Sequence, residues 1–185
     1  MSITGPRPPF ETTSLERRPD LGDQARRLGG EGWPPFLLHG DVTHWERLFD
    51  EFAGYQILFL DPSDDVISLG HTIPFVWDGT PDDLPDRVAG LMDRAVEDHR
   101  AGRHPNTLSA LAAIVSPTHR RRGLSAEILR AMRSLARENG LSSLIAPVRP
   151  TLKAAYPLTP FERYVRWTRE DGSAFDPWGS ASTAN

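Results

Sequence analysis

Apolar residues along this 185-residue chain form a few short continuous runs, separated by stretches in which they recur at helical spacing. The runs at 55–60 and 66–77 predict two strands, and the turn-forming sequence DPSDD between them predicts an antiparallel hairpin. The run TLSALAAIV at 107–115 is apolar over nearly its whole length, which is typical of a central strand buried on both faces. A further strand is predicted at 141–148.

Helical spacing predicts the elements between these strands. Residues 84–99 form one amphipathic pattern, and a second begins at Leu124 and ends at Asn139-Gly140, a usual C-terminal stop. A capping box of Thr43 and Glu46 predicts a short helix, and PTLKAAYPL at 150–158 predicts another. The order of elements indicates a mixed α/β fold whose sheet is mostly antiparallel.

Length and composition favour one domain with looser ends. A chain of this length that is 38% hydrophobic can bury one core, which we expect over residues 36–170. Residues 1–35 are rich in proline, glycine and charge, so we expect a flexible arm with at most a short strand and a short helix. Residues 171–185 have the composition of a flexible tail.

Charge and residue usage exclude several classes of function. A formal net charge of -4 argues against nucleic acid as a partner, and six scattered histidines with no cysteine give no metal-ligand spacing, so no metal is expected. No run of about 18 apolar residues is present, and the N-terminus lacks an apolar leader, so we expect a cytoplasmic protein without a membrane partner. The P-loop and the G-x-S-x-G elbow are also absent.

The sequence IVSPTHRRRGLS at 114–125 carries the main chemical signal. A strand that feeds a glycine turn and then a helix leaves backbone N–H groups unpaired at the helix start, where the helix dipole favours an anion such as phosphate. The arginines at 120–122 would be repelled by that dipole unless an anion sits among them, and Gly123 allows close backbone approach. A solvated basic turn closed by a glycine is the alternative.

This segment resembles the acyl-CoA-binding segment of the GCN5-related N-acetyltransferases (GNATs), in which a Q/R-x-x-G-x-G/A turn holds the pyrophosphate of coenzyme A. Arg120 falls on the Q/R position, Gly123 on the glycine and Ser125 on the final small residue. The resemblance implies a GNAT-like fold and acetyl-CoA or another acyl-CoA as cosubstrate. The residues it implies for binding are Ile114, Val115, Arg120, Arg121, Arg122, Gly123, Leu124 and Ser125.

A second part of the resemblance lies downstream, where the family often has N-P-x-A-x-x-x-Y. Arg149 takes the Asn position, Pro150 the Pro and Tyr156 the Tyr, so the resemblance implies that Tyr156 protonates the departing thiolate. A packed aromatic at a helix end is the alternative. Some relatives have a glutamate, which acts as the general base, where this chain has Ser109. Other candidates for the general base are suggested by their location only: His71, Glu97, Asp98, His99 and His104.

The chain departs from the family in having a helix before the central strand and only YVRW where two closing strands are usual. The protein is then a shortened form of the family, a homodimer whose partner subunit supplies the missing wall of the acceptor site, or a form with an open site. The leading hypothesis is direct acyl transfer to an unknown amine, with the thioester carbonyl polarised by backbone N–H groups near Ile114 and Val115. The rival hypothesis is a non-catalytic acyl-CoA-binding module. A domain that grips a phosphorylated or nucleic-acid partner is the weakest alternative.

Overall fold

The chain forms two compact units, residues 1–146 and residues 147–185. Their structure, a computed structural model, describes residues 10–32, 45–147, 150 and 152–176. The boundary between the units lies inside the stretch 36–170 for which the sequence suggested a single domain.

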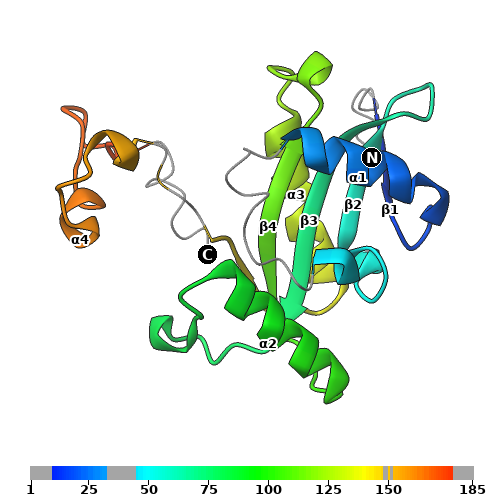
Figure 1. Cartoon of the computed structure of the whole chain (residues 1–185), viewed down its shortest axis with the longest axis horizontal. Coiled ribbons are helices and arrows are strands. Elements are labelled where there is room, and N and C mark those ends of the chain that lie inside the picture. Colours follow the sequence, from blue (N-terminus) through cyan, green and yellow to red (C-terminus); the bar gives the residue numbers. More distant parts are fainter. Residues whose placement is uncertain (1–9, 33–44, 148–149, 151, 177–185) are drawn as a thin grey trace, which may run out of the picture. The chain divides into compact units, whose positions relative to one another are not determined.

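The first unit is built on a five-stranded sheet with the strand order β1-β2-β3-β4-β5 (Figure 1). The first three pairings are antiparallel and only β4 and β5 run parallel, so the predicted mixed, mostly antiparallel sheet is confirmed. The hairpin of β2 and β3 and the bounds of β4 also follow the prediction. The strands are β1 (Glu11–Ser14), β2 (Gln56–Leu60), β3 (Val66–Phe75), β4 (Thr107–Val115) and β5 (Ser143–Ile145).

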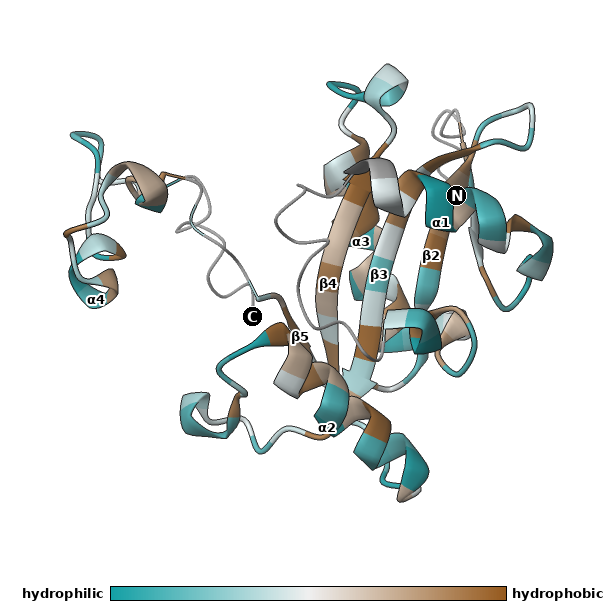
Figure 2. Ribbon diagram, in the orientation of Figure 1, coloured by the Kyte–Doolittle hydropathy of each residue, from teal (hydrophilic) through white to brown (hydrophobic). Residues whose placement is uncertain are grey.

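Helices cover both faces of this sheet. The helices α1 (Gly22–Gly32) and α2 (Val88–Arg100) pack on one face, and α3 (Leu124–Glu138) packs on the other (Figure 1). Figure 2 shows α1 as a largely hydrophilic helix, and the residues of α1 that pack on the sheet form a narrow apolar face. The helix α2 begins later than the predicted Leu84, because Leu84 precedes Pro85 and is held in an extended conformation.

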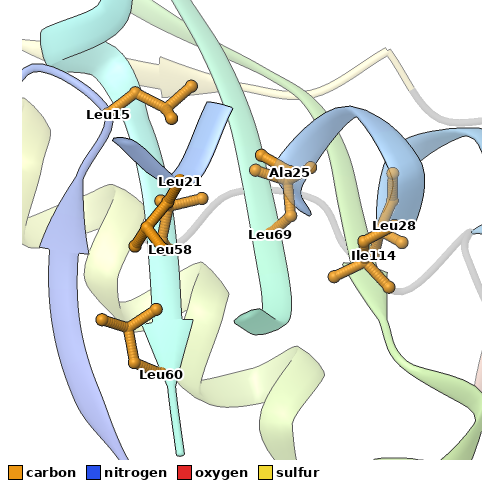
Figure 3. Packing of buried hydrophobic residues seen from close by; sticks show 8 residues of the cluster. All are labelled: Leu15, Leu21, Ala25, Leu28, Leu58, Leu60, Leu69 and Ile114. Carbon is orange, nitrogen blue, oxygen red and sulfur yellow. The ribbon is translucent and has the colours of Figure 1, made fainter. Parts of the chain in front are cut away.

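Residues 11–32, for which we expected a loose arm with at most a short strand and a short helix, supply both of these elements to the core. In β1, Glu11 pairs with Leu60 of β2. Ala25 and Leu28 of α1 are buried against Leu69 and Ile114 of the central strands (Figure 3). The amphipathic face of α1 therefore covers the end of β4 that leads into the arginine segment.

The helix predicted around residues 45–52 is replaced by two 3-10 turns, Trp45–Leu48 and Ala53–Tyr55. The second turn ends at Tyr55 and β2 begins at the next residue, Gln56, so the chain has only a few residues in which to pass into the strand. Trp45 and Phe49 nevertheless pack against the apolar cluster of β3 and α2, as their spacing indicated. Thr43 of the predicted capping box lies outside the described residues.

Among its described residues, the second unit holds a 3-10 turn at Lys153–Ala155, the short helix α4 (Phe161–Tyr164) and an isolated bridge between Thr168 and Ala174. Its centre is an aromatic cluster of Tyr156, Tyr164, Trp167 and Phe175. Tyr164 donates a hydrogen bond of 2.8 Å to Asp176, so the start of the predicted tail is part of this packing. The sequence YVRW at 164–167 begins at the last residue of α4, and it forms no strand within the described residues 152–176.

Candidate functional site

The strands β4 and β5 pair over only three residues. The ladder runs from Thr107 and Ser143 to Ser109 and Ile145, whereas β4 continues to Val115. Beyond Ser109, no described strand pairs with this edge of β4, and Ala113 is exposed on it. Backbone N–H and C=O groups along this edge are therefore available to an extended ligand, and the second half of β4 is less buried than its apolar sequence predicted.

A β-bulge bends β4 at the point where it leaves β5. His71 of β3 lies opposite Ala112, and Thr72 lies opposite Ala110, so Leu111 is the extra residue. A bulge interrupts the regular ladder and increases the local bend and twist of its strand. The change in direction separates the end of β4 from the line of β5.

The turn into α3 has the sharp geometry that its glycine predicted. Gly123 has a φ of 76° and Arg121 a φ of 63°, both in the left-handed region. No side chain caps the helix start, and the N–H groups of Ala126 and Glu127 both bond to Gly123 O. The N–H groups at the very start of α3 therefore remain without partners inside the helix, as an anion site requires.

A groove of about 530 Å³ lies along the end of β4 and the start of α3. It is lined by seven of the eight residues that the sequence assigned to acyl-CoA, namely Ile114, Val115, Arg120, Arg121, Gly123, Leu124 and Ser125, together with Ala113 and His119. Arg122, the eighth, is exposed and does not line the groove. Ala113 and His119 were not expected from the sequence, although His119 directly precedes the arginines.

The arginines of this turn have no acidic partner among the described residues. Arg120, Arg121 and Arg122 are exposed and make no hydrogen bond or ion pair there. Arg18, in contrast, bridges Asp20 and Asp64, each at 2.7 Å. Cations that gather at a helix N-terminus without a carboxylate are suited to bind an external anion.

Gly123 leaves room for such an anion. A Cβ placed on Gly123 would meet no described atom within 4 Å, so the backbone here faces open space. The unpaired N–H groups, the arginines and this opening together fit a pyrophosphate.

Two buried polar atoms in the described part of the chain have no hydrogen-bond partner, His71 Nε2 and Ser109 Oγ. Both residues are fully buried. His71 was one of the base candidates, and Ser109 occupies the position where some GNATs have glutamate. Burial lowers the pKa of His71 to about 4, so its ring is neutral near pH 7.

The remaining base candidates are not gathered at the groove. Asp98 accepts a hydrogen bond of 2.7 Å from the Val76 N–H and forms an ion pair of 2.6 Å with Arg103, which explains its burial by structure alone. The other three are exposed at the end of α2 or in the loop after it: Glu97, His99 and His104.

Tyr156 belongs to the second unit. It is half-buried, and its ring meets Trp167 edge-on with centroids 5.0 Å apart. The Lys153 ammonium donates a hydrogen bond of 2.9 Å to Tyr156 O. Arg149 lies outside the described residues.

Within the described ranges, no three side chains of His, Asp or Glu come together as a metal-binding group. None of the helices in that part of the chain combines the length and apolar character that a bilayer crossing requires.

The arrangement of this sheet, with a bent central strand that parts from its parallel neighbour and feeds a glycine turn, is that of the GNAT fold. The loading GNATL domain of CurA from Lyngbya majuscula superimposes with a TM-score of 0.71, at 16% identity, over 92% of this chain and 80% of that one. The GphF GNAT-like decarboxylase, solved with isobutyryl-CoA, gives a TM-score of 0.63 at 18% identity, over 90% and 80% of the two chains.

A curated relative agrees with this class of fold. The arginine N-acetyltransferase avaD of Aspergillus versicolor is 33% identical over an alignment of 164 residues, which covers 79% of this chain and 56% of the relative. The chain thus spans about half the length of the curated relative it matches. No family profile matches the chain. The chain has the GNAT fold and is similar in sequence to a curated N-acetyltransferase, as its motifs led us to expect.

Proposed function

We propose that this protein is an acyl-CoA-dependent N-acyltransferase that moves an acetyl or related acyl group directly to an amine. The observation that carries the proposal is the groove in which the open edge of β4 runs into the unpaired arginines of the turn before α3. The N–H groups of Leu124 and Ser125, with Arg120 and Arg121, would bind the pyrophosphate. The amide groups of the pantetheine arm would lie along β4 at Ala113–Val115.

The proposed reaction needs no covalent enzyme intermediate. The amine nitrogen attacks the thioester carbon, a C–N bond forms, the C–S bond breaks, and the proton lost by nitrogen balances the one gained by the thiolate. Backbone N–H groups near Ile114 and Val115 would polarise the thioester carbonyl. Tyr156 is the proposed proton donor to the thiolate.

For the acceptor, we propose a small amino acid or a related amine. The support is the relative that is named an arginine N-acetyltransferase, which makes L-arginine the first acceptor to test. Acetyl-CoA is the first donor, and isobutyryl-CoA is a second because a GNAT-like protein of similar fold binds it.

A non-catalytic acyl-CoA-binding module is the second candidate. One reason to favour it is that Ser109 stands at the position where a carboxylate would serve as the base. A second is that, in the described residues after β5, the only β structure is the isolated bridge between Thr168 and Ala174. Both candidates require CoA to bind in the groove, and only the first requires turnover.

Two measurements test the proposal. Calorimetry with CoA should give a single site, and thiol release from acetyl-CoA should depend on L-arginine or another amine from a panel that includes L-lysine and glycinamide. Binding without thiol release for any amine would favour the non-catalytic module. No binding of CoA or acetyl-CoA would overturn both candidates.

A further inference from the structure

The two unpartnered buried atoms lie on one face of neighbouring strands. Ser109 is opposite Ile73 in the register of β3 and β4, and His71 precedes Ile73 by two residues, so all three side chains share a face. This is the face that α1 and α2 cover. The bulge at Leu111 lies between Ser109 and Ala112, the residue opposite His71. These strands lie at the centre of the sheet (Figure 1).

Gln56 fixes which nitrogen of His71 carries the proton. The side-chain amide of Gln56 donates to the carbonyl oxygens of Phe52 and Thr72, each at 2.9 Å. Its Oε1 therefore faces His71 Nδ1, at 2.9 Å, and an amide oxygen can only accept. Nδ1 carries the hydrogen, and Nε2 presents a lone pair.

Ser109 adds a second acceptor at a significant position. It is the last residue of β4 that pairs with β5, directly before the strand edge opens toward the groove. Buried polar atoms in native proteins are almost always hydrogen-bonded, and each one that is left unpaired destabilises the fold. Two such atoms on one face, beside a bulge and at the end of a ladder, indicate that a ligand completes their bonding.

We propose that His71 Nε2 and Ser109 Oγ accept hydrogen bonds from the two N–H groups of an uncharged acceptor amine. The lone pair of the amine is then free to attack the thioester carbon, with the bond changes described above. This inference rests on the proposed acyltransferase function and names the residues that recognise its second substrate.

The chemistry of the site favours the neutral form of the amine. A neutral imidazole and a hydroxyl supply no negative charge, so an ammonium ion placed there would lose its hydration without an ion partner. Two charged groups on the helices that cover this face have ion partners of their own. Arg26 of α1 pairs with Glu46 at 3.2 Å, and Asp98 of α2 pairs with Arg103. The protein then needs no carboxylate at Ser109, because it selects an amine that has already lost its proton.

The pH profile of kcat/KM tests this directly. With glycinamide as acceptor, kcat/KM should rise tenfold per pH unit and level off at the pKa of the free amine, about 8. With 2,2,2-trifluoroethylamine, whose fluorines lower the pKa of its amine, the inflection should move to lower pH by as much as the pKa of the free amine falls. An inflection at one fixed pH for both amines would reveal a base on the enzyme and overturn the proposal.

Binding of the amine is followed without turnover by ¹⁵N NMR of the histidine rings in the full chain with CoA present. The Nε2 signal of His71 should shift on titration with glycinamide at pH 9. A signal that does not move at saturating glycinamide overturns the proposal even when CoA binds. Failure of CoA to bind is a separate result, which overturns the proposed function itself.

Matched variants separate recognition from folding. The side chain of His71→Asn can still donate an N–H to Gln56, but it has no atom at the position of Nε2. The longer side chain of His71→Gln restores a polar group at that position. We expect kcat/KM for glycinamide to fall by at least roughly tenfold in the first variant and less in the second, with the Kd for CoA unchanged. Equal losses in both variants, or no loss, would contradict the role assigned to Nε2.

Ser109→Ala gives the clearest contrast. Removing an unpartnered buried hydroxyl should raise Tm, because the folded protein no longer buries an unsatisfied oxygen. The same variant should lower kcat/KM for the amine by roughly tenfold, because one acceptor is lost. A serine that is only part of the core would change Tm and leave the rate unchanged, and that result would overturn the proposal.

Discussion

Ser109 of β4 pairs with Ile145 of β5 at the last position of their parallel ladder. The groove at the start of α3 lies beyond this pair along β4, and the unpartnered atom of Ser109 lies on the face covered by α1 and α2. An acyl donor bound in the groove and an amine bound at Ser109 would therefore meet along β4, where this strand parts from β5. The point where the strands part is thus where the proposed reaction would occur.

Replacing Gly123 by valine should abolish CoA binding while the fold persists. A β-branched residue is strained at a φ of 76°, and its side chain would occupy the open space in front of the turn. Gly140→Val is the matched control, because Gly140 ends the same helix at a φ of 68° and also faces open space. Both variants should lose about 1–2 kcal/mol of stability. CoA affinity that is equal in the two variants by calorimetry would contradict the site.

The arginines are expected to differ from one another. Arg120, which falls on the Q/R position of the motif, lines the groove, whereas Arg122 does not. Arg120→Ala should weaken CoA binding by about 1–3 kcal/mol, the value of a charge-assisted hydrogen bond, and Arg122→Ala should change the Kd less than about threefold. Equal weakening in both variants would place the pyrophosphate elsewhere on the turn. The loss for Arg120 should shrink at high salt.

Local sequence signals predicted the elements that carry the candidate site. The run at 107–115 has the length and composition of a buried strand, and the structure gives it the same bounds. Gly123 at the strand-to-helix junction predicted a turn, and its positive φ is the conformation in which glycine is favoured. These features depend on neighbours in sequence, so one sequence was enough to find them.

Other features depend on tertiary pairing. Leu21, Ala25 and Leu28 have the helical spacing of a buried face, but the surrounding proline, glycine and charge outweighed that signal in the prediction of a loose arm. The relationship of His71 and Ser109 required the register of β3 on β4, including its bulge, which no local pattern specifies. The burial of both residues follows from helices that are distant in sequence.

Tyr156→Phe should lower kcat by about 10²-fold or more, the scale for loss of a general acid, with little change in the KM for acetyl-CoA. Tyr164→Phe is the control within the same aromatic cluster. The Tyr164 hydroxyl bonds to Asp176, and burial together with this bond raises its pKa to about 12. Its loss should therefore destabilise the second unit without a specific effect on kcat. Unchanged turnover in Tyr156→Phe would make that residue a packing aromatic.

The stability of the first unit should fall as the pH drops from about 6.5 to 4. The pKa of His71 is about 4 in the folded protein and near 6.5 in the unfolded chain, because burial penalises the imidazolium. Between these values the unfolded chain binds more protons than the folded one, so the free energy of unfolding decreases with falling pH. The loss approaches about 3 kcal/mol near pH 4, in addition to any contribution from carboxylates.

Urea unfolding at pH 7 and at pH 4.5 measures this loss, and His71→Gln serves as the comparison because glutamine does not titrate. The decrease between the two pH values should be smaller in the variant by about 2–3 kcal/mol. If parent and variant lose the same amount, His71 is protonated in the folded protein near its ordinary pKa. Such a ring would carry a proton on Nε2 near pH 5, where it could no longer accept a hydrogen bond from an amine.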